Sequence, residues 1–177
     1  MIPRVHGDVP SRTEIEELLD LAVRAPNHHR TEPWRFCVLV ADERERLARA
    51  IADELVDSKG ADPAAALDEG RAKVDRAPVI VVFTAIPSSD PKVVVQEEIA
   101  SVAMAIENFL IGAHAKGLGA MLRTGAAAYH PSIREHLGLA PTEVVVGIAY
   151  CGPPAADRPV TERAPATEKT TWLGWNA

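Results

Sequence analysis

The residues best suited to chemistry lie in one proline-rich stretch, RAPNHHRTEPWRF, at positions 24–36. Two of its three arginines, Arg24 and Arg30, lie close in the sequence to two adjacent histidines and a tryptophan. Such cationic and planar side chains could bind a metal, a nucleic acid or a flat ligand, or they could serve only to stabilise their own loop. Because Pro26 disfavours helical geometry at the residue before it, we expect this stretch to be a loop.

A metal site at His28 and His29 is disfavoured. Neighbouring side chains in an extended segment point in opposite directions, and the sequence has no third ligand at the spacing of a known zinc motif. The histidines His114, His130 and His136 lie in or beside predicted helices, and we interpret them as partly exposed helix residues. The sequence therefore predicts no bound metal, and a metal hydrolase that uses His28 and His29 is the less favoured alternative.

Two common catalytic signatures are missing from the sequence. A serine hydrolase would need a nucleophile turn such as GxSxG. A dinucleotide-binding loop would need GxGxxG between a strand and a helix, whereas GLGA here follows a predicted helix and precedes a predicted strand. Any cofactor must therefore be held by a less regular set of residues.

Composition and charge limit the class of protein. A chain of 177 residues has about the size of one domain, so we predict a single domain over residues 1–177. A content of 47% hydrophobic and 25% charged residues is ordinary for a folded protein and disfavours general disorder. The net charge of -6 disfavours a nucleic-acid partner, because phosphates would be repelled.

The cysteines and the hydropathy of the sequence indicate in which cellular compartment the protein would be found. Cys37 and Cys151 both lie in apolar runs that are predicted to be strands, where a thiol usually behaves as a small buried hydrophobe. The sequence has no disulfide framework and no CxxC motif, so a reducing cytoplasm is expected. It also has no charged-then-apolar leader and no apolar run of about 18 residues, and we expect no membrane association.

Hydrophobic periodicity defines the elements that would position these residues. Ser11 and Glu14 have capping-box spacing and open a helix that ends before Pro26. Further helices are predicted after Asp42, from Asp62-Pro63, from Asp90-Pro91 (the longest) and over 131–137. Strands are predicted at WRFCVLV (34–40), APVIVVFTAI (77–86), the run ending at 123–125, and EVVVGIAYCG (143–152).

This order of elements predicts an α+β fold, in which helices flank a small, mainly antiparallel mixed sheet. From about residue 153 to 177 the chain has four prolines and no helical period, so we predict an extended C-terminal arm. The arm ends with Trp172 and Trp175, whose large apolar groups favour burial. It is therefore expected to dock on the same chain or on a second copy.

Three segments resemble one known family. RAPNHHRTEPWRF is similar to the AP(S/D)…QPW.F signature of the FMN-dependent nitroreductase family, especially its short YdjA-like branch. GLGAMLRTGA resembles the glycine turn of that branch, which is followed by an apolar or aromatic residue, Arg, Ser or Thr, and Gly. VGIAYCGPP resembles its last core strand. The matches keep their order from about Arg4 to Pro154 and imply a nitroreductase-like fold.

The resemblance also implies a cofactor site in a homodimer, with FMN between the two subunits. By the family pattern, Arg24 would bind the phosphate or ribityl region, and His28 would reach the flavin across the dimer interface. The ring and phosphate would be lined by Leu122, Arg123 and Thr124, with backbone groups near Gly125 at the ring edge. Trp34 and Phe36 are assigned to packing, because alternation along a strand points them to one face.

The implied activity is that of a flavin oxidoreductase. NAD(P)H would donate hydride to flavin N5 and leave, and a flat electron acceptor such as a nitroaromatic or quinone would enter the same slot. This scheme predicts ping-pong kinetics. The flavin carries the chemistry, so no catalytic side chain is implied, although a cation such as Arg123 could stabilise charge on the reduced ring.

The sequence departs from the family pattern at two places. The family begins with a basic RRS or RR(S/T) element; an ungapped alignment places Met1 at its serine and Arg4 on a further arginine. The Arg-Arg pair is absent, so either the chain starts upstream of Met1 or FMN is bound less tightly, because each charge-assisted hydrogen bond contributes about 1.5–3 kcal/mol. A flavin-free or weakly flavin-binding dimer with a scaffold role is the alternative. Glu32 replaces a frequent Gln and is expected to face solvent.

Overall fold

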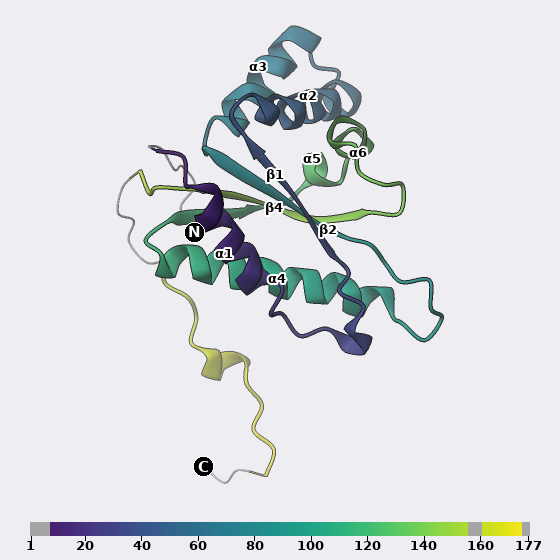
Figure 1. Cartoon of the computed structure of the whole chain (residues 1–177), viewed down its shortest axis with the longest axis vertical. Helices are drawn as coiled ribbons and strands as arrows, with labels where there is room; N and C mark the ends of the chain where they lie inside the picture. Colours follow the sequence, from purple (N-terminus) through teal and green to yellow (C-terminus); the bar gives the residue numbers. More distant parts are fainter. Residues whose placement is uncertain (1–7, 156–160, 175–177) are drawn as a thin grey trace.

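A four-stranded sheet forms the centre of the computed structural model, which describes residues 8–155 and 161–174. The strand order is β1-β2-β4-β3 (Figure 1). The strands are β1 Trp34–Val40, β2 Val79–Ala85, β3 Gly119–Arg123 and β4 Val144–Gly152. All three neighbouring pairs are antiparallel, so the predicted α+β fold with a mainly antiparallel sheet is confirmed, and within the described ranges the sheet is antiparallel throughout rather than mixed.

Helices cover both faces of the sheet (Figure 1). One face packs against α2 Arg44–Lys59, α3 Pro63–Val74, α5 Ala126–Tyr129 and α6 Pro131–Leu137. The other packs against α1 Arg12–Ala22 and α4 Val95–Ala115. Every residue of β2 is buried, with Ile80 and Val82 in the first core and Val81 and Phe83 in the second. This two-sided burial explains why both faces of the strand carry apolar side chains, with Thr84 as its one polar residue.

The predicted capping box opens α1. The Ser11 side chain accepts a hydrogen bond from the Glu14 backbone at 3.2 Å, and a Glu14 carboxylate oxygen accepts one from the Ser11 backbone at 2.8 Å. The latter bond lowers the pKa of Glu14 below its ordinary value. Both bonds satisfy backbone N–H groups that a helix start leaves without partners.

Two helix starts differ in their match to the sequence pattern. Asp62 caps α3 as predicted, since its carboxylate accepts from the Ala64 and Ala65 backbones at 3.1 and 3.0 Å. The prediction that Asp90-Pro91 opens the longest helix was wrong. The Asp90 carboxylate and carbonyl instead accept from Lys92 and Val93, both at 2.9 Å, which closes a turn before α4 begins at Val95. The short helix α5 was not predicted.

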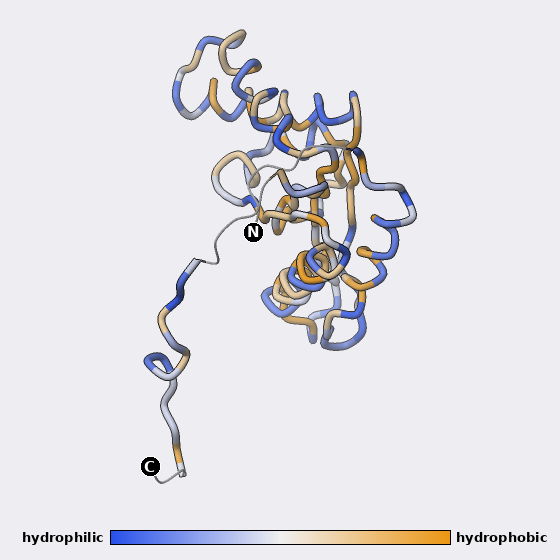
Figure 2. The backbone as a smooth tube through the Cα atoms, turned by 90° about the vertical axis from the view of Figure 1, so that its left-hand side faces the viewer, coloured by the Kyte–Doolittle hydropathy of each residue, from blue (hydrophilic) through white to orange (hydrophobic). Residues whose placement is uncertain are grey.

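The C-terminal segment 161–174 runs away from the body of the molecule in both backbone views (Figures 1 and 2). Its residues are exposed, with a single 3-10 turn at Ala166–Lys169; two similar turns, His28–Arg30 and Ala41–Glu43, flank β1. Trp172 is 61% and Leu173 86% exposed. The arm is extended as predicted, but this described part does not dock on its own core. Trp175 lies outside the described residues.

None of the helices in the described ranges combines the length and the apolar character that crossing a bilayer requires.

Candidate functional site

The end of β3 presents its side chains alternately to the two faces of the sheet. Leu122 packs with the α1/α4 core and lies against Gly147, where an added Cβ would come within 2.6 Å of the leucine side chain. Arg123 points to the other face, and its guanidinium lies 5.7 Å from the centre of the Tyr150 ring. The predicted residues Leu122 and Arg123 therefore do not share a face.

Arg123 and Thr124 line a pocket of about 170 Å³ between the sheet and the α2/α3 layer. Two further cations reach the same pocket: Lys73 from the last turn of α3 and Arg76 from the connection to β2. The remaining lining is Ile51, Ala127, Ala128, Ile148 and Tyr150. The pocket thus combines a largely apolar wall with three cationic side chains, and none of its lining residues is acidic.

The charges of the pocket are only partly neutralised. The Lys73 ammonium pairs with a Glu69 carboxylate oxygen at 2.7 Å, outside the lining. Arg123 forms no ion pair with any described residue, and the buried Arg76 Nε has no hydrogen-bond partner there. A buried N–H without an acceptor is costly, so the pocket is suited to a ligand that offers acceptors.

The side chain of Arg44 holds the segment that contains Arg76. The Arg44 guanidinium donates to the carbonyls of Val74 and Ala77, at 3.2 and 2.8 Å, and so clamps the connection between α3 and β2. Tyr150 on β4 forms part of the pocket wall on the side of the sheet. Burial raises the pKa of its phenol above the ordinary value, although Arg123 and Arg76 oppose the rise. A neutral phenol leaves the positive charge of the pocket intact.

Sequence reasoning missed Lys73, Arg76 and Tyr150 as pocket residues. The one available signal was Arg76 itself, a cation placed directly before the buried strand in VDRAPVIVV. Gly125, which was predicted, follows the pocket residue Thr124 and has φ 109°. That conformation is accessible mainly to glycine, and it leaves the backbone there without a covering side chain.

The loop at 24–32 has a different construction. Arg24 is exposed and makes no side-chain hydrogen bond to the residues that the structure describes. The His28 ring contacts a Glu97 carboxylate oxygen on α4 through Nδ1 at 2.7 Å and stacks on His29 at 3.9 Å. Glu32 is exposed, as expected.

Asn27 organises this loop. Its side-chain oxygen accepts from the Glu32 backbone at 2.8 Å, and its amide donates to Ser101 on α4 at 3.3 Å. Three residues without glycine's freedom, His29, Arg30 and Glu32, have φ values of 60°, 53° and 47°. Such left-handed conformations are strained for side chains of this size and often occur at functional sites.

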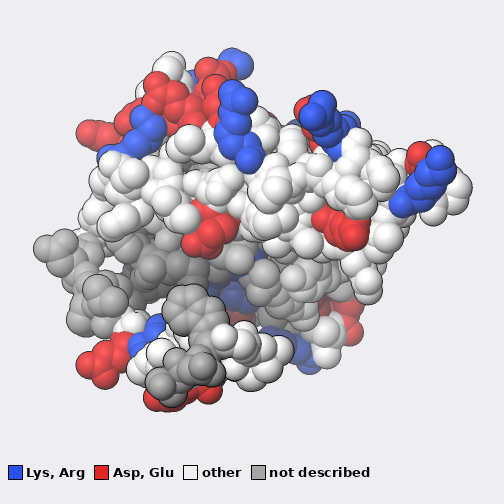
Figure 3. Space-filling view, turned by 90° about the horizontal axis from the view of Figure 1, so that it is seen from below, with Lys and Arg blue, Asp and Glu red and all other residues white. Residues whose placement is uncertain are grey.

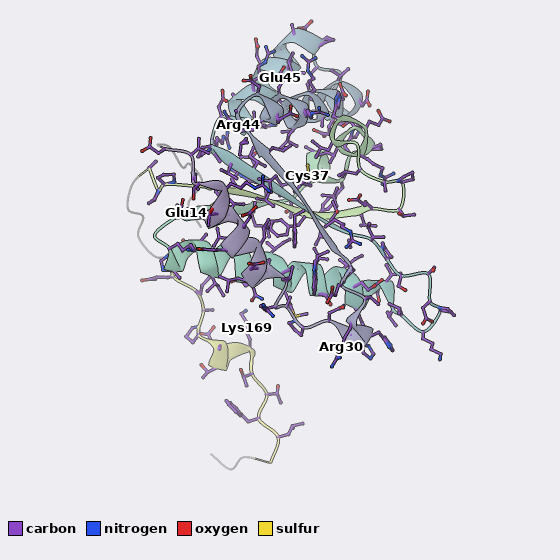
Figure 4. The ribbon with its side chains drawn as sticks, viewed as in Figure 1. Glu14, Arg30, Cys37, Arg44, Glu45 and Lys169 are labelled. Atoms are coloured by element: carbon purple, nitrogen blue, oxygen red, sulfur yellow. The ribbon has the colours of Figure 1, made fainter. Side chains whose placement is uncertain are left out.

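Within one chain, the loop and the pocket lie on opposite faces of the sheet. The loop contacts α4, whereas the pocket belongs to the α2/α3 face. Figure 4 agrees, since Arg30 lies below α4 while Arg44 and Glu45 lie on the far side with α2. A single chain therefore does not join Arg24 and His28 to Leu122–Gly125, and the predicted contact of His28 across a dimer stays a prediction. Arg4 lies outside the described residues.

The outer side of the α1/α4 layer exposes large apolar side chains. Leu21 is 45%, Met104 39% and Ile111 59% exposed. Among the described residues visible from below, charged side chains lie mainly along the edge of the face, with some acidic groups nearer its middle (Figure 3). A surface of this kind is typical of protein contacts.

The histidines beside α6 have structural contacts. The His130 ring lies 2.8 Å from the Ser132 hydroxyl, and His136 lies 2.6 Å from an Asp53 carboxylate oxygen. Both are partly exposed, as interpreted from the sequence, whereas His114 is exposed. Within residues 8–155 and 161–174, no three His, Cys, Asp or Glu side chains are grouped so as to hold a metal ion.

Comparison with known proteins gives a consistent result. The model of the nitroreductase family matches residues 6–153. "Putative NAD(P)H nitroreductase YdjA" of Escherichia coli K12 is 30% identical over 151 residues, 85% of this chain and 81% of that protein. "Putative NAD(P)H nitroreductase YfhC" of Bacillus subtilis 168 is 27% identical over 166 residues, 92% of this chain and 84% of that protein.

Solved structures have the same fold. A nitroreductase-like family protein from Bacillus cereus superposes with a TM-score of 0.84 at 24% identity, covering 98% of this chain and 90% of that one. A "putative nitroreductase in complex with fmn" from Desulfovibrio desulfuricans gives a TM-score of 0.76 at 21% identity, covering 99% and 92%.

Proposed function

The chain belongs to the nitroreductase family of oxidoreductases, and from this premise we propose that it binds FMN and passes hydride from NADH or NADPH to a flat electron acceptor. The observation that carries the proposal is the cationic pocket at the end of β3, where the buried Arg76 Nε finds no acceptor among the described residues. The isoalloxazine offers carbonyl and ring-nitrogen acceptors on a planar apolar body, so the residues present fit it.

Each pocket residue would have a distinct role. Arg123 and Arg76 would donate charge-assisted hydrogen bonds, and Thr124 would add a hydroxyl donor. Gly125 would expose backbone groups to the ring edge, while Leu122 supports β3 from the opposite face. Bound FMN would supply the hydride chemistry. The tasks of the protein are to orient the ring and to stabilise charge, and no side chain has to act as an acid or base.

A second copy of the chain would complete the site. Arg24 and His28 lie on the far face of the sheet from the pocket, so in this proposal they reach FMN that is held by the partner. The exposed Leu21, Met104 and Ile111 supply apolar surface for such a homodimer. The exposed arm 161–174 would add a further contact to the second copy.

The acceptor proposed here is a nitroaromatic or a quinone, and the proposed location is the cytoplasm. The two cysteines, Cys37 and Cys151, are free, which suits a reducing compartment.

An FMN titration tests the proposal. Purified protein should bind FMN with saturation and become yellow, and under anaerobic conditions NADH or NADPH should bleach the flavin absorbance. Addition of a quinone or nitroaromatic should then restore it. The titration is repeated with a form that carries any residues encoded upstream of Met1, because the family's basic element would lie there.

Two outcomes would contradict the proposal. If neither form binds FMN, the flavin-free scaffold role becomes the better account of the fold. If FMN binds but no nicotinamide reduces it, the protein is a flavin-binding module without the proposed activity.

A further inference from the structure

Two contacts hold the His28 ring and involve only one of its nitrogens. Its Nδ1 lies 2.7 Å from a carboxylate oxygen of Glu97, in the first turn of α4, and the ring stacks on His29 with 3.9 Å between the ring centroids. The preceding residue, Asn27, donates a hydrogen bond to Ser101 of the same helix at 3.3 Å. Nε2 makes no hydrogen bond to any residue that the structure describes, so one nitrogen is anchored to α4 and the other is free.

The Glu97 carboxylate determines where the ring carries its proton. An ionised carboxylate can only accept a hydrogen bond, so Nδ1 of His28 carries the hydrogen of this contact. Nε2 is then an acceptor on the neutral ring and an N–H donor on the charged ring. The His28 side chain is 65% exposed, so Nε2 can take a proton from water and pass it on.

The backbone of the loop supports this arrangement. In an extended segment the rings of adjacent residues would point apart, but His29 has φ 60° and its ring lies on that of His28. His29 and Glu97 are the titratable groups that contact the ring among the described residues. Glu98, the next residue of α4, is buried and accepts a hydrogen bond from the Ser88 backbone at 2.7 Å. It therefore does not compete with Glu97 for His28.

We propose that His28 donates the proton that a quinone takes up when it is reduced, and that Glu97 is the positioning residue for this step. In the proposed function, on which this role rests, His28 reaches the cofactor held by the partner. The quinone gains a hydride from the reduced cofactor and one proton, which together give the hydroquinone. The Nε2–H bond of charged His28 breaks, an O–H bond forms on the quinone, and the neutral ring recovers a proton from water.

Water can also supply this proton, so His28 would set the rate of the step and not its occurrence. A donor that is held in place reacts faster than water because it needs no further ordering. Glu97 restricts rotation of the imidazole and keeps a proton on Nδ1, which leaves Nε2 as the donating nitrogen.

The test separates electron acceptors by their need for a proton. Protein saturated with FMN is reduced with NADPH or NADH and then mixed with a quinone, which takes up a proton, or with ferricyanide, which takes up an electron alone. Glu97→Ala removes the carboxylate that holds His28. Asp53→Ala is the matched control, because it breaks another histidine–carboxylate contact, to His136 at 2.6 Å, on the opposite face of the sheet.

Glu97→Ala should slow reoxidation by the quinone about tenfold, because a positioned acid contributes roughly 100-fold or more and a misplaced one keeps only part of that. Reduction by the nicotinamide and reoxidation by ferricyanide should be unchanged, since neither needs this proton. His28→Gln should lose more than Glu97→Ala with the quinone and nothing with ferricyanide. Asp53→Ala should match the unaltered protein with both acceptors.

A measurement without FMN tests the positioning itself. Ring nitrogen NMR of His28 should place the proton of the neutral imidazole on Nδ1 in the unaltered protein. In Glu97→Ala both tautomers should be populated, because no carboxylate selects between the two nitrogens. The His136 signals should be the same in these two proteins.

Three results would overturn the inference. Equal losses with the quinone and ferricyanide would mean that Glu97 supports only the binding of the cofactor or access to it. An unchanged quinone rate in Glu97→Ala would mean that water supplies the proton, and an unchanged tautomer would mean that Glu97 does not position the ring. If the unaltered protein binds no FMN, or no nicotinamide reduces it, the proposed function itself fails and this role with it.

Discussion

The pocket at the end of β3 and the loop at 24–32 carry similar cationic side chains but are built in opposite ways. The pocket takes its residues from α3, β3 and β4, which are held in place by a packed core and by the Arg44 clamp. The loop is exposed, includes three strained residues and depends on a few polar contacts to α4. The pocket is therefore formed within one chain, whereas the exposed loop would meet a second copy in the proposed dimer.

The largest expected effect comes from disturbing the packing behind the pocket. In Gly70→Ala the added Cβ would lie 2.2 Å from the Ala48 carbonyl oxygen, so α2 and α3 must separate. We expect a loss of about 3 kcal/mol in the free energy of unfolding, or roughly 6–12 °C in the thermal midpoint for a chain of this length. FMN binding should weaken as well, because Lys73 and Arg76 move with α3.

Gly60→Ala is the control for that measurement. Gly60 has φ +64° and no atom within 4 Å of the added Cβ, so only backbone strain of about 1 kcal/mol is expected. Similar thermal midpoints for the two variants would contradict the view that close helix packing supports the pocket.

The next largest effect is expected in FMN binding, measured for one variant in the pocket, one variant in the loop and a mixture of the two. Arg123→Leu should weaken FMN binding about 10- to 100-fold, because a charge-assisted hydrogen bond contributes about 1.5–3 kcal/mol. His28→Ala should also weaken it. When the two variants are mixed, each heterodimer should regain one intact site, which has an unaltered pocket from one chain and an unaltered loop from the other.

The mixing experiment is read from FMN binding at a concentration where neither variant alone is saturated. A gain in bound flavin after subunit exchange supports a site shared between chains. If exchange is demonstrated by mass spectrometry and no binding returns, the loop and the pocket do not act on the same ligand.

A smaller effect is expected from loosening the loop. Asn27→Ala removes the acceptor for the Glu32 backbone and the contact to Ser101, at a cost of about 1 kcal/mol. Because the loop lies outside the core, the thermal midpoint should change little, while amide hydrogen exchange at 28–32 becomes faster. Asn108→Ala, which removes a bond to the Leu21 carbonyl on the same side of the sheet, should leave exchange in the loop unchanged.

A large fall in the thermal midpoint of Asn27→Ala would show that the loop is part of the folding core. The loop would then resemble the pocket in being held by the packed core, and the contrast between the two regions would be wrong.

Local sequence patterns were sufficient for most of the fold. The Ser11 capping box, the strand at 34–40 and the short helix closed by Gly138 all occur where their patterns place them. The start of α4 was misplaced because an aspartate can cap a turn as readily as a helix. The helix α5 has four residues, too few for a periodic pattern to appear.

Local sequence patterns predicted less of the candidate site than of the fold. The resemblance singled out Arg123 and Thr124, which do line the pocket. It did not indicate Lys73 or Arg76, because their approach to Arg123 depends on β4 lying between β2 and β3 and on α3 packing over that face. Sheet order and helix docking are set by contacts between distant segments, and no short motif encodes them.

The smallest predicted effect concerns how the free energy of unfolding depends on the ionisation of Tyr150 at high pH. Burial raises the pKa of Tyr150 above its ordinary value, so the folded protein holds this proton more tightly than the unfolded chain. The stabilisation is complete below about pH 10 and is lost as the pH rises through the folded-state pKa. Between about pH 9 and 11, the free energy of unfolding should therefore fall less steeply in Tyr150→Phe than in the unaltered protein.

Burial also raises the pKa of Cys151 to about 12, but that contribution is common to both proteins and cancels when their free energies of unfolding are compared. Urea unfolding at each pH measures the difference, with the exposed Tyr129→Phe as control. Parallel curves for Tyr150→Phe and the unaltered protein would mean that Tyr150 is as well hydrated as an exposed phenol, and that the pocket is wetter than its packed walls indicate.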